Sequence, residues 1–174
     1  MKRYSRSVAW LMMAVVVLQW SSVLDACTIL GIGKKAMADG TTVITHNDDS
    51  SVADYPLRIV PAADWPDGAT RKIIANAHTR EGGNVLGTMP QVKHTYRYFM
   101  SRYSFMNEKG VAIAESTFGI DTTTERGKKL KDVMYTKGDG LVDCWMAQDV
   151  ALERAATARD AVRIMGKLVE EFSF

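Results

Sequence analysis

The chain has few of the residues that mark several common classes of protein. Of its 174 residues only two are cysteines, Cys27 and Cys144, and only four are prolines. A chain with two cysteines is not a disulfide scaffold, because such scaffolds use several bridges in place of a large core. The chain has no zinc-like spacing of His, Cys or Asp, no phosphate loop and no dinucleotide fingerprint. We therefore expect no cofactor and no metal.

The first 26 residues predict a secretory signal peptide. Lys2, Arg3 and Arg6 form a basic start, the stretch 8–20 is apolar, and small residues follow up to Ala26. The apolar run is shorter than the roughly 20 residues that cross a bilayer. We expect cleavage after Ala26, a secreted or periplasmic protein and no membrane span after cleavage.

Two other interpretations of the leader stay open. The first is an uncleaved anchor. The second is a lipoprotein, because Leu24-Asp25-Ala26-Cys27 resembles a bacterial lipobox. Asp25 fits that motif poorly, and the chain continues into an apolar stretch rather than the flexible polar linker that usually follows a lipidated cysteine.

Net charge is also low once the leader is removed. The formal charge of the whole chain is +2, and residues 1–26 hold three basic residues and one acidic residue, so the remainder is close to neutral. A neutral domain does not have the basic surface that binds nucleic acid or anionic membranes. Residues 27–174 are enough for one domain with a core.

Cleavage after Ala26 would make Cys27 the first residue of the mature protein. Its thiol and its free α-amine would then supply a nucleophile and a base on one residue. Cys144 is expected to pack as a small apolar residue in a helix. We do not expect a disulfide between the two, because it would consume the nucleophile.

The residues after Cys27 predict an antiparallel hairpin. The runs 28–33 and 41–47 are rich in β-branched residues and are joined by a loop ending in Asp39-Gly40. The hairpin would return His46-Asn47-Asp48-Asp49 to the side of Cys27. These polar residues predict either a site or a turn capped by its own side chains, and spacing alone does not decide between them.

The rest of the chain predicts more strands and then two helices. Extended pieces are expected near 57–60, 72–75, 85–86 and 96–105. A turn over 106–110 and a return strand over 111–117 complete a second hairpin, whose polar end is Glu115 to Thr117. A polar surface loop is expected over 121–140. Helical spacing over 141–156 puts Leu141, Trp145, Gln148, Leu152 and Ala155 on one stripe. Thr157 is a good N-cap for a second helix, with Ala161, Ile164, Leu168 and Phe172 on one face.

Helices on one face of this sheet would leave the other face bare, although a strand set this apolar usually has a second layer. We therefore expect residues 27–174 to be the first part of a longer domain. On its own this part should be marginally stable, self-associate and show little activity.

Four motifs in order carry a family resemblance. They are Ala26-Cys27-Thr28 with the following loop, Asn47-Asp48-Asp49, the stretch 106–115, and the helix pair containing 151–155 and 157–161. Together they resemble the cysteine-type dipeptidases, the dipeptidase A and secernin group of the N-terminal-nucleophile hydrolase superfamily. Penicillin V acylase and bile salt hydrolase are related to this group.

The resemblance implies an α+β fold, an αββα sandwich that is incomplete in this chain. It implies a dipeptidase with Cys27 as nucleophile, assisted by Asp49 and Thr117. The related acylases have an arginine at the position of His46. This chain therefore lacks the arginine that would stabilise the substrate or the thiol. His46, Asn47 and Glu115 are the candidate substrate-binding residues. A dipeptide is the expected partner, and a homo-oligomer stays open. The alternatives are an acylase of another linear amide and a lipid-anchored binding protein.

Overall fold

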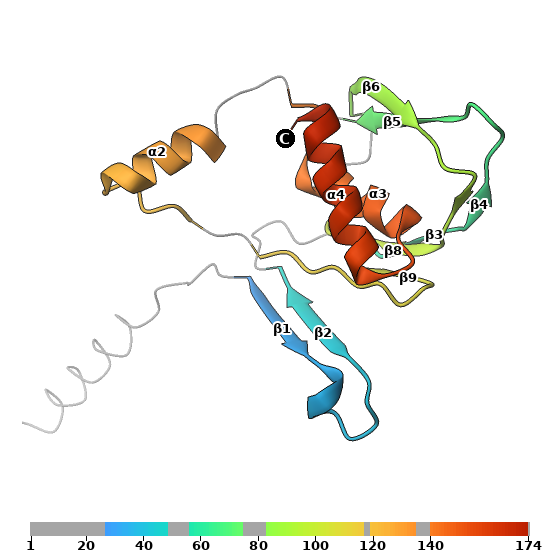
Figure 1. Cartoon of the computed structure of the whole chain (residues 1–174), viewed down its shortest axis with the longest axis horizontal. Helices are drawn as coiled ribbons and strands as arrows, with labels where there is room; N and C mark the ends of the chain where they lie inside the picture. Colours follow the sequence, from blue (N-terminus) through green and yellow to red (C-terminus); the bar gives the residue numbers. More distant parts are fainter. Residues whose placement is uncertain (1–26, 49–55, 75–82, 117–118, 135–139, 174) are drawn as a thin grey trace, which may run out of the picture.

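The fold is described from a computed structural model, which covers residues 27–48, 56–74, 83–116, 119–134 and 140–173. It is a mixed α+β structure of short antiparallel sheets and helices (Figure 1). The predicted α+β class is confirmed at this level. The two-sheet αββα sandwich stays a prediction.

The first hairpin forms where the sequence predicts it. Strands β1 (Thr28–Ile32) and β2 (Val43–Asn47) pair antiparallel from Thr28↔Asn47 to Ile32↔Val43. The connection contains the 3-10 turn η1 (Lys34–Ala36) and turns at Gly40, whose φ of 72° favours glycine. In Figure 1 the hairpin projects from the rest of the molecule, with Cys27 and Asn47 at the end that meets the body.

The remaining strands form three small antiparallel sheets. Strands β3, β8 and β9 form one sheet, β4 pairs with β7, and β5 pairs with β6. Their bounds are β3 (Arg58–Val60), β4 (Ala63–Asp64), β5 (Thr70–Ile74), β6 (Val85–Pro90), β7 (His94–Thr95), β8 (Tyr98–Met100) and β9 (Met106–Asn107). Each extended piece expected between 57 and 105 overlaps one of these strands.

Two helices pack on these sheets, α3 (Cys144–Arg154) and α4 (Ala158–Phe172). Asp143 caps α3 by accepting a hydrogen bond from the N–H of Met146, and Thr157 caps α4 through the N–H of Asp160. The predicted N-cap at Thr157 is confirmed. So is the apolar face of α4, because Ala161 and Leu168 are buried and Ile164 and Phe172 pack against the core.

The stripe predicted for the helix at 141–156 lies in the core or packs against it, but the helix buries its other sides as well. Residues 146–153 of α3 are all buried, because α3 packs against α4 and also against the strands. Its two buried carboxylates are paired. Glu153 accepts hydrogen bonds from Arg71 at 2.7 to 3.0 Å, and Asp149 accepts one from Ser104 at 2.6 Å. Helical periodicity cannot show such a helix, because it has no solvent face.

Two further predictions need correction. The segment 121–140 is not only loop, since it contains α2 (Glu125–Met134). The Thr124 hydroxyl, just before this helix, accepts a hydrogen bond from the N–H of Gly127 in its first turn. The segment 111–117 is not a regular strand. Among its described residues only the bridge Met106↔Ala112 is formed, flanked by hydrogen bonds from the Asn107 N–H to the Val111 carbonyl and from the Ile113 N–H to the Phe105 carbonyl.

The sheet of β3, β8 and β9 buries one face only. Tyr98 and Asn107 face the helices and are 4% exposed. Ile59, Phe99 and Met106 lie opposite one another in the register and are 61%, 37% and 37% exposed. These three side chains give this small sheet an exposed apolar face, whereas the broad bare face of a larger sheet stays a prediction.

Candidate active site

Cys27 is held in place by its neighbours in space. The Ser116 hydroxyl donates a hydrogen bond to the Cys27 carbonyl at 3.2 Å. The next residue, Thr28, donates its N–H to the Asn47 side-chain oxygen at 2.7 Å. The cysteine is half-buried. Contacts from β2 and from residue 116 thus fix the backbone on which the thiol is mounted.

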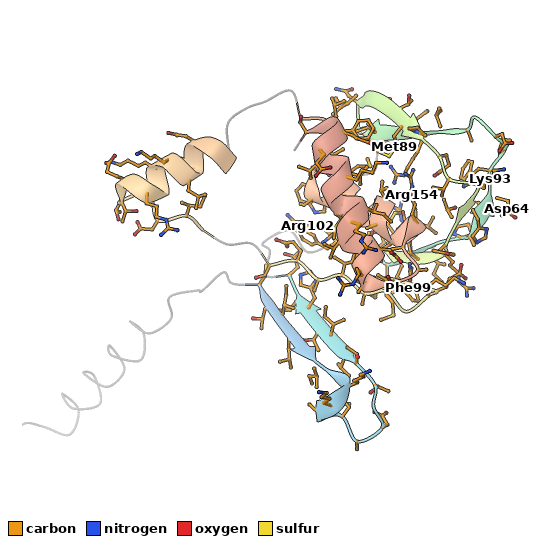
Figure 2. The ribbon with its side chains drawn as sticks, viewed as in Figure 1. Asp64, Met89, Lys93, Phe99, Arg102 and Arg154 are labelled. Carbon is orange, nitrogen blue, oxygen red and sulfur yellow. The ribbon has the colours of Figure 1, made fainter. Side chains whose placement is uncertain are left out.

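The thiol faces a carboxylate that is itself paired with an arginine. Cys27 Sγ lies 3.7 Å from Asp48 Oδ1, and Arg102 Nη1 lies 3.6 Å from Asp48 Oδ2. The side chains of Asp48 and Arg102 are 25% and 23% exposed. Figure 2 shows Arg102 where the β1–β2 hairpin meets the body of the molecule.

Aromatic rings form a wall beside this group. The ring of Tyr103 lies 5.7 Å from the ring of His46 and 5.7 Å from that of Trp145, measured between centroids. Burial, followed by the charge of Glu115, raises the pKa of Tyr103 to about 12. Tyr103 is therefore a neutral phenol at physiological pH, and Glu115 lies close enough to influence it.

The second cysteine has a different environment. Both cysteines are free thiols, and Cys144 is the first residue of α3. Burial and then the charge of Asp143 raise the pKa of Cys144 to about 11. The thiolate is the nucleophilic form, so Cys144 is a poor nucleophile near neutral pH.

An apolar hollow lies beside the hairpin. Its volume is about 270 Å³, and its lining comes from β2 and from the segment 105–114, namely Ile44, Thr45, His46, Phe105, Met106, Ala112, Ile113 and Ala114. Because side chains alternate along a strand, His46 and Asp48, the first residue after β2, are expected on the same side. Within the described residues the buried His46 Nε2 has no hydrogen-bond partner. The hollow therefore offers apolar walls and one unused polar atom, on the strand that leads to Asp48.

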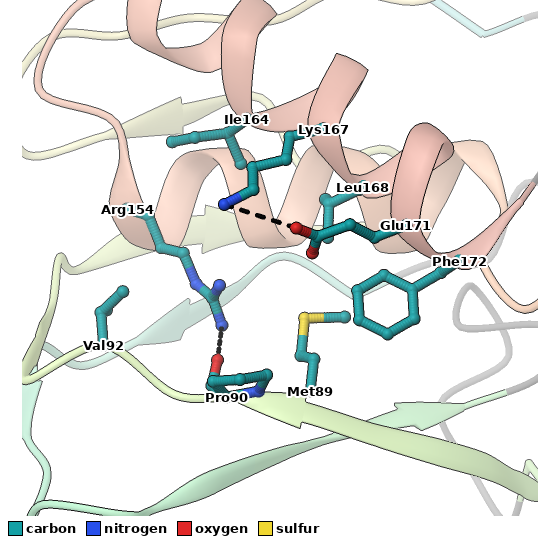
Figure 3. A pocket seen from close by; sticks show the side chains of 9 residues that line it. All are labelled: Met89, Pro90, Val92, Arg154, Ile164, Lys167, Leu168, Glu171 and Phe172. Atoms are coloured by element: carbon teal, nitrogen blue, oxygen red, sulfur yellow. Dashed lines mark hydrogen bonds and ion pairs between the residues drawn. The ribbon is translucent and has the colours of Figure 1, made fainter.

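A larger hollow of about 360 Å³ lies elsewhere, between α4 and β6 (Figure 3). Its charged groups are already engaged. Arg154 donates to the Pro90 carbonyl at 3.0 Å, and Lys167 pairs with Glu171 at 3.4 Å. Its lining contains no cysteine, so it does not share the chemistry of the Cys27 site.

The structure brings together four of the six predicted site residues. Asn47 contacts the residue after Cys27, His46 lines the apolar hollow, and Glu115 precedes Ser116 and acts on Tyr103. The other two, Asp49 and Thr117, lie outside the described residues. In the described part of the chain, no group of three His, Cys, Asp or Glu residues could hold a metal ion, and no helix is long and apolar enough to cross a membrane.

Comparison with known proteins identifies the family. The sequence model of peptidase family C69 matches residues 26–174, which is most of the chain. The chain belongs to peptidase family C69. The predicted resemblance to this group of cysteine dipeptidases is confirmed at the level of the family.

One relative of the chain is a protein of Latilactobacillus sakei named "Probable dipeptidase". It is 26% identical over 162 residues, which make up 86% of this chain and 31% of that protein. The chain thus spans about a third of the length of this relative. No solved structure matches the chain.

Sequence reasoning did not select three neighbours of Cys27 and His46, namely Asp48, Arg102 and Tyr103. Asp48 stands in the polar run 46–49, where Asp49 was selected instead. Strand alternation could have favoured Asp48. His46 lies opposite Ile29, and Asp48 is two residues after His46, so it is expected on the same side. Arg102 and Tyr103 follow β8, far along the chain, and no local pattern connects them to Cys27.

Proposed function

We propose that this chain carries the nucleophile-bearing part of an exported cysteine dipeptidase. The observation that carries the proposal is the fixed position of Cys27 between Ser116, Asn47 and Asp48. The family match begins at Ala26, immediately before this cysteine, and a relative is named a probable dipeptidase. Cleavage after Ala26 by signal peptidase belongs to the proposal, since the leader has the pattern of a signal peptide.

The reaction is acyl transfer through a thioester. The Cys27 α-amine takes the thiol proton, directly or through a water, and the thiolate attacks the carbonyl carbon of the substrate peptide bond. The C–N bond breaks as the leaving amine takes up that proton. Water then attacks the thioester, which releases the second amino acid and regenerates the thiol. An α-amine has an ordinary pKa of about 7.7–8.0, which suits proton transfer near neutral pH.

The surroundings suit a small peptide substrate. The hollow beside His46 has room for an apolar side chain, and His46 Nε2 is available for a polar group of the substrate. Asp49 is proposed to hold an amine, either that of Cys27 or that of the substrate. Thr117 is proposed to assist backbone N–H groups in stabilising the oxyanion, a contribution of about 2.7–4 kcal/mol for one donor in other enzymes.

The test combines processing with activity in the complete gene product, expressed in an exporting host. The mature N-terminus is expected to read Cys-Thr-Ile-Leu with no added mass. Cys27→Ala is expected to abolish release of amino acids from a panel of dipeptides. The matched variant Cys144→Ala is expected to leave that activity nearly intact.

Three results would refute the proposal. A mature N-terminus other than Cys27 removes the amine from the thiol. A mass increase corresponding to acyl chains shows a lipid anchor instead of a nucleophile. Activity that depends on Cys144 and not on Cys27 shows that the nucleophile has been assigned to the wrong cysteine.

A further inference from the structure

We propose that Arg102 is a positioning residue of this site, which holds the Asp48 carboxylate and offsets its charge beside the Cys27 thiol. This inference rests on the proposed function, because it concerns the ionisation of the proposed nucleophile. Arg102 acts through Asp48 and does not itself touch the reacting atoms.

The geometry makes Asp48 a bridge between the thiol and the arginine. One carboxylate oxygen, Oδ1, faces Cys27 Sγ at 3.7 Å, and the other, Oδ2, faces Arg102 Nη1 at 3.6 Å. About three-quarters of each charged side chain is covered by protein. Water therefore screens this arrangement less than it screens an ion pair on the open surface.

The segment that carries Arg102 is anchored in the core. Ser104, two residues later, is 1% exposed and donates its hydroxyl to Asp149 of α3 at 2.6 Å. The guanidinium also lies 5.7 Å from the ring of the next residue, Tyr103. Arg102 thus extends from a fixed piece of backbone, as a residue that positions another side chain requires.

The charges explain why an arginine is needed here. A carboxylate beside a thiol disfavours its ionisation, because the thiolate adds a second negative charge nearby. A guanidinium on the far side of that carboxylate compensates for the repulsion, and it stays protonated at every pH at which a thiol titrates. Without Arg102, the negative charge of Asp48 would act on Cys27 unopposed.

Other ionisable groups lie around Cys27, Asp48 and Arg102, and they are the same in the wild type and in the Arg102 variants. They are the α-amine of Cys27 and the side chains of His46, Tyr103, Glu115 and Cys144. Tyr103 and Cys144 lose their protons at about pH 12 and pH 11, above the range in which the experiment is read.

The experiment measures the rate at which iodoacetamide alkylates Cys27 in the full chain, as an exporting host produces it. Peptide mapping by mass spectrometry separates Cys27 from Cys144, and the rate is followed from about pH 6 to about pH 10. Arg102→Met is expected to move the midpoint of the profile upward by about half a pH unit. This is less than the effect of roughly one unit that Asp48 exerts from 3.7 Å in a water-like dielectric, because Arg102 lies on the far side of that carboxylate. Alkylation at pH 7 should slow by about threefold.

Three variants show whether the effect depends on charge and passes through Asp48. Arg102→Lys keeps the charge and should keep the midpoint near that of the wild type. Asp48→Asn combined with Arg102→Met removes both charges and should return the midpoint to the wild-type value or slightly below it, because Asp48 is the nearer of the two charges. Arg97→Met is the matched control, because Arg97 comes from the same segment and pairs with Glu108 at 3.7 Å.

An Arg102→Met profile that overlays the wild type would overturn the inference, as would a double variant that keeps the full shift. If Arg102→Met does not fold, as judged by thermal unfolding, the lysine variant and the double variant decide by the same criteria. Loss of dipeptide hydrolysis in Cys27→Ala with an unchanged Arg102→Met profile would leave the proposed function standing and remove this inference. Dipeptide hydrolysis that survives in Cys27→Ala, together with a shifted Arg102→Met profile, would remove the proposed function and leave the coupling of Arg102 to the thiol standing.

Discussion

Replacement of Asn107 is the most informative test of the fold, because this one side chain joins the turn at 107–110 to helix α3. Asn107 is 4% exposed and its amide group makes four hydrogen bonds. Nδ2 donates to the carbonyls of Leu152 and Ala155 at 2.9 and 2.8 Å. Oδ1 accepts from the N–H groups of Lys109 and Val111, both at 3.0 Å. The last carbonyls of a helix have no partner within it, so Asn107 caps the end of α3.

The magnitude follows from these four bonds. At roughly 1 kcal/mol of net stability for each bond, Asn107→Ala should lower the free energy of unfolding by about 4 kcal/mol. That is a large share of the roughly 5–15 kcal/mol typical of a domain. Asn107→Asp has nearly the same shape and keeps both accepted bonds. It should nevertheless cost a similar amount, because an ionised oxygen would then face two carbonyl oxygens.

Urea unfolding of the full chain, followed by circular dichroism, measures these changes. Asn84→Ala is the matched control, since Asn84 is exposed before β6 and should change stability by no more than about 0.5 kcal/mol. If Asn107→Asp unfolds at the same urea concentration as the wild type, the two donated bonds do not hold the turn to α3, and the reasoning fails.

Three other predictions address the core, the bare sheet face and the aromatic wall. Glu153→Gln should destabilise the fold by about 3–5 kcal/mol in chemical denaturation, because Arg71 would stay buried without its carboxylate; equal stability would show that the charge of Glu153 is dispensable. Gel filtration should show that the wild-type chain self-associates through its exposed apolar face and that Ile59→Lys with Phe99→Lys reduces this; an unchanged elution volume would refute it. Absorbance titration should show one tyrosine ionising at about pH 12 that is lost in Tyr103→Phe. The folded state keeps that proton longer than the unfolded state, so stability should fall as the pH rises from about 10 to about 12.

Much of the local structure could be read from the sequence, because short-range rules govern it. The β-branched runs on either side of Asp39-Gly40 were enough to predict β1 and β2, and Thr157 with Asp160 was enough to place the start of α4. The helix α2 was missed although Thr124 and Glu125 are residues that start helices, because glycine and dense charge in the segment outweighed them. The leader and the order of motifs pointed to the family and to Cys27.

The surroundings of Cys27 depend on contacts between distant segments. Ser116 and Arg102 reach the site from 89 and 75 positions along the chain, and no spacing rule extends over such separations. The choice of Asp48 as the carboxylate beside the thiol depends on the pairing and twist of β1 and β2, which neighbouring acidic residues in a sequence do not reveal. Likewise, the burial of α3 on all sides comes from what packs around it, not from its own periodicity. Local propensity determines which elements form, and only long-range packing determines which side chains meet at the thiol.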